Sequence, residues 1–264
     1  MSRSITPYGK DHLAIRAFRA MAWMSLVFLA GAPLAMALTT DHAASATHPL
    51  IPDTVQQRAK ACTRCHGEHG EGAPDSSDGP RLAGKPAGYL LLQLRYFQSG
   101  QRENAAMEYV LRQLDVDYMR QLADYFANQQ IAYRQPRVAQ VSAAVLKRGE
   151  QLSLHGDAVI GIPACNSCHG GKLNGVEPLI PGLVGLSSDY LEDELNAWRN
   201  RTRAAKEPFC MGIVANRLRA EDVTAVASWL ASQKPAANMQ PEPASEQTTP
   251  LPGWCVMSGH GDSP

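Results

Sequence analysis

The chain has 264 residues, enough for about two small domains that each bury a core. Hydrophobic residues make up 44% of it and charged residues 19%, as in an ordinary soluble protein, and its 25 basic side chains balance its 25 acidic ones. This balance gives no case for nucleic-acid binding, which relies on strongly basic surfaces.

The first residues have the features of an export signal. A basic stretch is followed by an apolar run over residues 20–38, and Ala35-Met36-Ala37 offers the small residues that a signal peptidase requires. We therefore predict a signal peptide over residues 1–37 and a periplasmic protein. Cleavage at Ala44-Ser45-Ala46 is an alternative, and so is an uncleaved leader that attaches the protein to the membrane.

Two Cys-x-x-Cys-His pentads, at residues 62–66 and 165–169, are the most informative motif of the chain. The two thiols of a pentad lie one helical turn apart, where they can bond to the two vinyl groups of one haem, and the following histidine is placed to ligate the iron. Zinc knuckles are spaced more closely, and a thioredoxin-like dithiol needs a βαβ context. The sequence thus predicts two covalent haem c groups, bound through Cys62, Cys65 and His66 and through Cys165, Cys168 and His169.

Apolar residues at helical spacing predict the elements around each pentad. In the first half, one helix begins at Pro86 and ends at Gly100, and another covers about residues 116–128. In the second half, helices cover about residues 142–154, 188–200 and 221–232. Because no alternating β pattern competes, the expected fold class is all-α.

The predicted helices group into two domains, at residues 50–133 and 142–233, with a linker near residues 131–142. The remaining tail, residues 234–264, is rich in Pro, Ser and Gln and has no periodicity. We expect it to be extended or disordered, with Cys255 as the one reason for part of it to be fixed.

The two domains are copies of one unit, because their residues match well beyond the pentads. The matched positions include Leu82-Ala83-Gly84 with Leu183-Val184-Gly185, Tyr89 with Tyr190, Leu94 with Leu195, Arg102 with Arg203, and Met107 with Met211. Pro80 and Pro181 also follow their pentads at similar distances, and their carbonyl groups could accept the Nδ1–H of the ligating histidine.

The matched methionines, Met107 and Met211, are the candidates for the second axial ligand of each iron. Both are expected in loops before the last helix of their copy. A soft thioether ligand favours ferrous iron and raises the reduction potential, as suits electron transfer. Most methionines only fill a core, and Met119 on a helical apolar face is expected to do so.

Two cysteines remain after the pentads, Cys210 and Cys255. In an oxidising compartment two such thiols usually pair, so a disulfide between them is favoured over two unrelated thiols.

The order of these blocks resembles the dihaem cytochromes c of the cytochrome c4 type, over about residues 55–233. The blocks of the first copy are residues 62–67, 80–84, 89–94 and 100–107, whereas the second copy departs at Arg201 and Cys210. The resemblance implies two class I cytochrome c domains. It also implies a periplasmic carrier, not an enzyme, that moves single electrons from a quinol-oxidising complex or a dehydrogenase to a terminal oxidase.

Two other functions are compatible with two covalent haems. One is a haem-bearing subunit of a membrane oxidase or dehydrogenase complex. The other is a dihaem enzyme of the peroxidase or thiosulfate-oxidising type, which needs an iron with an open or displaceable position. The paired methionines argue against the enzyme, because as second axial ligands they would leave no open position on either iron.

Overall fold

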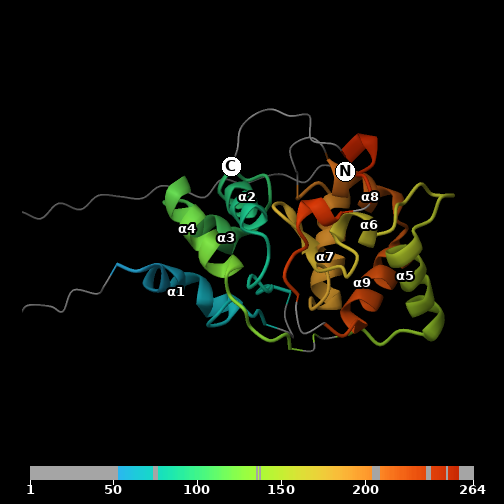
Figure 1. Ribbon diagram of the computed structural model, residues 1–264, viewed down its shortest axis with the longest axis horizontal. Helices are drawn as coiled ribbons and strands as arrows, with labels where there is room; N and C mark the ends of the chain where they lie inside the picture. Colours follow the sequence, from blue (N-terminus) through green and yellow to red (C-terminus); the bar gives the residue numbers. More distant parts are fainter. Residues whose placement is uncertain are drawn as a thin grey trace, which may run out of the picture. The chain divides into compact units, whose positions relative to one another are not determined.

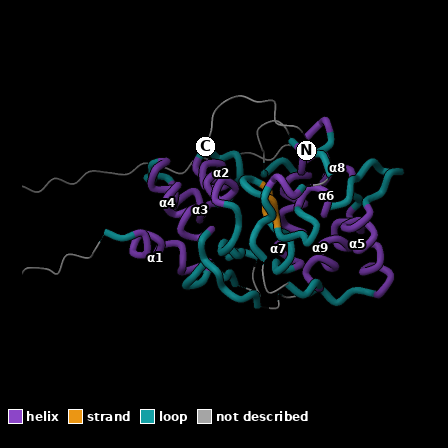
Figure 2. The backbone as a smooth tube through the Cα atoms, in the orientation of Figure 1, coloured by secondary structure: helices purple, strands orange, loops and turns teal. Residues whose placement is uncertain are grey.

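The computed structural model describes residues 53–73, 77–134, 136, 138–203, 209–235, 239–247 and 249–255. The predicted signal peptide, residues 1–37, lies outside the described residues. Over the described ranges the chain is mostly helical (Figures 1 and 2), which confirms the expected all-α class. None of the helices found there combines the length and the apolar character needed to cross a bilayer.

The first half contains four helices within its described residues: α1 (Val55–His66), α2 (Ala87–Gln98), α3 (Ala105–Leu111) and α4 (Val116–Ala127). Three of them begin at a side chain that accepts a hydrogen bond from a free backbone N–H of the first turn, namely Thr54, Asn104 and Asp115. The helix α2 follows Pro86, and Gly100 with φ +72° lies just beyond its end. Both boundaries agree with the sequence prediction.

The second half repeats this order with additions. Its elements are α5 (Ala143–His155), α6 (Asn166–His169), β1 (Gly175–Val176), β2 (Ile180–Pro181), α7 (Ser188–Arg199), α8 (Cys210–Arg217), α9 (Ala220–Ser232) and the 3₁₀ turns η1 (Ala244–Glu246) and η2 (Gly253–Cys255). The strands β1 and β2 pair antiparallel, with Val176 opposite Ile180. This short hairpin was not predicted, because strands of two residues are too short to show an alternating pattern.

Each half has its own hydrophobic core. In the first half, α2 and α4 pack together around residues such as Leu91, Leu111 and Met119. Met119 is 1% exposed, so it is the core residue that the sequence predicted. In the second half α5 packs against α9, and the two helices approach closely at Gly149.

Two expectations need correction. Met107 and Met211 do not lie in loops: they belong to the short helices α3 and α8. The tail after residue 234 is not disordered over its described part, because Met239 is 6% exposed and packs in the core of the second half. At the start of the expected linker, the Arg81 guanidinium donates to the Ile131 carbonyl oxygen at 2.5 Å.

Candidate haem sites

The first pentad forms the last turns of α1, so its thiols and its histidine are presented from one rigid element. His66 is 6% exposed, and its Nδ1 lies 2.8 Å from the Pro80 carbonyl oxygen. Because a carbonyl only accepts, Nδ1 carries the proton and the lone pair lies on Nε2. Burial lowers the pKa of His66 against the effect of this hydrogen bond, so the ring is neutral at neutral pH, as an iron ligand must be.

The second pentad repeats the same arrangement on α6 and the turn before it. His169 is 7% exposed, and its Nδ1 lies 2.8 Å from the carbonyl oxygen of Pro181, which belongs to β2. Burial again lowers the pKa of the ring. The expected proline carbonyl is therefore present in both copies, and in the second copy the β hairpin carries it.

The candidate methionines reach the same cores as the pentads. Met107 packs against the first core together with Cys62, and Met211 packs against the second core together with Cys165. The position of Met107 is fixed by Asn104, whose side chain accepts from the Met107 backbone N–H at 3.0 Å. Each half thus packs one pentad thiol and a thioether against one core, and the same pentad presents a second thiol and a buried neutral imidazole, which fits a covalent haem. Ligation of iron by Met107 and Met211 stays a prediction.

A buried polar junction joins the two halves, and the sequence did not reveal it. Arg102 of the first half donates to Gln93 at 3.0 Å, and it also contacts the carboxylate of Glu194 in the second half. Arg203 of the second half contacts the same carboxylate and donates to Gln93 at 2.8 Å. The backbones of Arg102 and Arg203 form an antiparallel bridge. The match between Arg102 and Arg203 is recognisable in the sequence, but a sequence repeat does not predict that the two matched residues contact each other.

The junction carries more positive than negative charge. Burial alone would raise the pKa of Glu194, but the guanidinium groups of Arg203 and Arg102 outweigh burial and lower it, so this group is a carboxylate. Lys85 donates to the Gly182 carbonyl oxygen at 3.0 Å nearby. Loss of hydration, with the cations Arg81, Arg203 and Arg102 around it, lowers the pKa of Lys85 to about 7. A surplus of partly buried positive charge fits a cofactor that itself carries carboxylates, as haem does.

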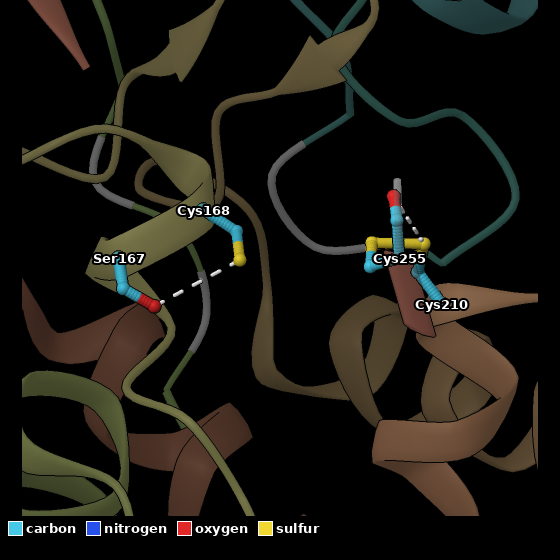
Figure 3. Close-up of a disulfide and its surroundings, with 4 residues drawn as sticks. All are labelled: Ser167, Cys168, Cys210 and Cys255. Atoms are coloured by element: carbon cyan, nitrogen blue, oxygen red, sulfur yellow. Dashed lines mark hydrogen bonds between the residues drawn. A yellow bond between two sulfur atoms is a disulfide. The ribbon is translucent and has the colours of Figure 1, made fainter. Parts of the chain in front are cut away.

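The predicted disulfide is present between Cys210 and Cys255 (Figure 3). It connects η2, at the end of the described tail, to the first residue of α8, directly before Met211. The four pentad cysteines form no disulfide in the structure.

The chain is similar to several known proteins. No protein-family model matches the chain. The chain is 39% identical over 175 residues to a thiosulfate dehydrogenase electron acceptor of Thiomonas intermedia, covering 66% of this chain and 79% of the relative. It is 30% identical over 178 residues to a cytochrome c4 of Pseudomonas aeruginosa, covering 66% and 85%.

Two solved structures are similar as well. Reduced cytochrome c4 from Pseudomonas stutzeri matches with a TM-score of 0.57 and 27% identity, over 68% of this chain and 97% of that one. A thiosulfate dehydrogenase from Marichromatium purpuratum matches with a TM-score of 0.61 and 29% identity, over 68% of this chain. The match covers only 40% of the Marichromatium chain.

Proposed function

Since the chain belongs to the cytochrome c4 family of dihaem class I cytochromes c, we propose that it is the electron acceptor of a thiosulfate dehydrogenase and passes single electrons on to a terminal oxidase. It is an electron-transfer cytochrome with two covalently bound haem c groups. The choice of donor rests on one observation: two relatives, 39% and 37% identical, are thiosulfate dehydrogenase electron acceptors. A quinol-oxidising complex is the other donor compatible with the family.

In this proposal the residues of each copy have matched roles. Cys62 and Cys65 hold the first haem, and Cys165 and Cys168 hold the second. When bound, the haems supply one-electron chemistry at their irons. The imidazoles of His66 and His169 and the thioethers of Met107 and Met211 would hold the two irons. The Pro80 and Pro181 carbonyl oxygens accept from Nδ1 of these imidazoles, which fixes the ring orientation and leaves Nε2 free to bind a metal.

The proposed ligands also bear on whether the chain is an enzyme. A histidine and a methionine on each iron would leave no position for a substrate, so the protein would exchange electrons without binding thiosulfate. We further propose that residues 1–37 export the chain to the periplasm, and that residues 50–133 and 142–233 form the two haem domains. The support for two domains is that each half has a separate core.

The donor is tested by following reduction of the purified ferric protein in its visible spectrum. We expect no reduction by thiosulfate alone and rapid reduction when thiosulfate and a catalytic amount of a thiosulfate dehydrogenase are both present. Reduction by thiosulfate alone would mean that the chain is itself the enzyme. No reduction in the complete mixture, with the dehydrogenase shown to reduce another acceptor, would overturn the proposed donor. Rapid binding of carbon monoxide to the reduced protein would contradict closed coordination.

A further inference from the structure

The described part of the C-terminal tail contacts the second haem site at several points. We name residues 239–247 and 249–255 the strap. It starts in the core of the second half at Met239 and ends at Cys255, which is bonded to Cys210 beside the candidate ligand Met211. Its contacts in between lie on the loop after His169 and on the pentad itself.

The first of these contacts fixes the strap on the loop that follows His169. The Glu242 carboxylate accepts from the backbone N–H groups of Gly171, at 3.0 Å, and Lys172, at 3.4 Å. The Glu242 backbone also pairs with β1, donating to the Gly175 carbonyl oxygen at 2.9 Å and accepting from the Glu177 N–H at 2.8 Å. A charged acceptor on two backbone donors, together with a backbone pair, is a specific attachment and not a random contact.

The second contact is with the pentad. The Gln247 side chain donates to the Ser167 carbonyl oxygen at 3.2 Å, and Ser167 stands between the two haem-binding cysteines. Figure 3 shows Ser167 and Cys168 in the surroundings of the Cys210–Cys255 disulfide. The strap therefore touches the segment that carries the thioether bonds and the helix that carries Met211.

The first copy gives an internal comparison, because among the described residues no segment equivalent to the strap contacts its pentad. Cys65 is exposed, whereas the matching Cys168 is partly buried. On α3 the side chain of Tyr109 is 65% exposed and that of Val110 is 37% exposed, whereas the matching Ile213 and Val214 of α8 are only partly exposed. The apolar surface around the first site is open, and that around the second is more closely covered.

From these contacts we propose that the strap closes the second haem site to redox partners, so that partners exchange electrons with the protein at the first haem site. A haem bonded to Cys165 and Cys168 would have its attached edge beside the pentad segment that the strap contacts. Electron exchange between proteins needs close approach of the two cofactors, and a bound segment prevents it. The inference rests on the chain being an electron carrier but does not depend on which protein is the donor.

Solvent access to each haem tests the proposal directly. In the ferric holoprotein the haem methyl resonances are assigned to each half by their contacts with neighbouring residues, and a neutral gadolinium chelate is then added. We expect strong broadening for the first haem and weak broadening for the second. Equal broadening in the unmodified protein would overturn the proposal without any variant being made.

Release of the strap provides the second arm. The double variant Glu242→Ala/Cys255→Ser removes the carboxylate anchor and the disulfide, so that the single Gln247 hydrogen bond is the side-chain contact left on the pentad, and we expect the second haem to broaden like the first. Glu246→Ala is the matched control, because it removes an exposed carboxylate of the same strap without touching the pentad loop. Hydrogen exchange at the Gly171 and Lys172 amides reports release independently of electron transfer. Released amides with a still-protected second haem would contradict the strap as the cover, and amides that stay protected would contradict the attachments.

Access should also change the rate at which a protein partner reacts. With a reduced monohaem cytochrome c as donor, the double variant offers two open sites where the native protein offers one. We expect its second-order rate constant to rise by about twofold, with the Glu246→Ala control unchanged. An unchanged rate constant in a variant whose second haem has become accessible would show that partners do not use the second site at all, and the strap would then have no role in partner access.

Discussion

Gln93 and Glu194 occupy matching positions in the two copies, and each accepts hydrogen bonds from both Arg102 and Arg203. The pair is symmetric in geometry and asymmetric in charge, because one member is an amide and the other a carboxylate. A single negative charge therefore serves two buried guanidinium groups.

Glu194→Gln removes the carboxylate that contacts both arginines. Two buried cations are then left facing amides, which we expect to lower the free energy of unfolding by about 3 kcal/mol. Denaturant unfolding of the holoprotein measures this. The exchange variant Gln93→Glu/Glu194→Gln returns the carboxylate from the other copy and should recover most of the loss. If the exchange variant is as unstable as Glu194→Gln, the position of the charge matters more than its presence.

Met107→Ala and Met211→Ala should each leave one iron without its thioether ligand. We expect the corresponding haem to become high-spin or to take another ligand, and its reduction potential to fall, because a soft ligand no longer favours the ferrous state. A redox titration followed by visible spectroscopy resolves this for each haem. Met119→Ala is the control: this core methionine should cost about 3 kcal/mol of stability and leave both spectra unchanged. An unchanged spectrum in Met107→Ala or Met211→Ala would rule out that ligand.

Asp222→Asn should weaken the attachment of α5 to α9 in a pH-dependent way. The Asp222 carboxylate is fully buried and bonds to Arg148 of α5 at 2.7 Å. Burial alone would raise its pKa, but hydrogen bonds from Arg148 and Arg219 lower it from 3.8 to about 2. A folded-state pKa below the unfolded value stabilises the fold above pH 3.8, and this contribution is lost as the pH falls toward 2.

We therefore expect the free energy of unfolding of the native protein to be about 2 kcal/mol higher than that of the Asp222→Asn variant at pH 6. This difference should shrink as the pH falls from about 4 to about 2. Thermal or denaturant unfolding of both proteins over this range measures the difference. A difference that stays constant with pH would mean that the carboxylate charge is not what Arg148 recognises.

Gly149→Ala should test the close approach of α5 and α9. A Cβ at this position would lie 2.0 Å from the Ala225 carbonyl oxygen and 2.6 Å from the Trp229 Cβ, so one helix must move away. We expect a loss of about 3 kcal/mol in unfolding free energy. Gly253→Ala, where an added Cβ meets nothing within 4 Å, is the control and should leave stability unchanged. Equal stability of the two variants would show that α5 can shift freely.

The fold was predictable where local signals were strong. Helices at α2, α4, α5, α7 and α9 lie within one or two residues of their predicted bounds, because capping residues and apolar spacing act over a few neighbours. The short helices that carry Met107 and Met211 were missed as helices, because seven or eight residues hold too little periodicity. The β1–β2 hairpin was missed for the same reason.

The haem sites were predictable to the level of residue types, and their connections were not. The matched positions of Pro80 and Pro181 after the pentads predicted that their carbonyl oxygens accept from the histidine Nδ1 atoms, and the structure contains both hydrogen bonds. The contacts of Glu194 with two arginines, and of Glu242 with the loop after His169, join residues far apart in the chain. From its composition the tail was predicted to be extended or disordered. Its sequence has no periodic pattern from which contacts such as that of Glu242 could be predicted.

The disulfide beside Met211 has a consequence for how the protein matures. On the proposed assignment of the pentads to haem, its six cysteines have two opposite chemical fates: Cys210 and Cys255 are oxidised, while the four pentad thiols must stay reduced until each has bonded to haem. Within a pentad the thiols are three residues apart and can compete for oxidation, whereas Cys255 is 45 residues from its partner. Production of this protein would therefore depend on the order of two reactions, haem attachment and disulfide formation, and we expect a host that oxidises thiols too early to yield chains whose pentads cannot bond to haem.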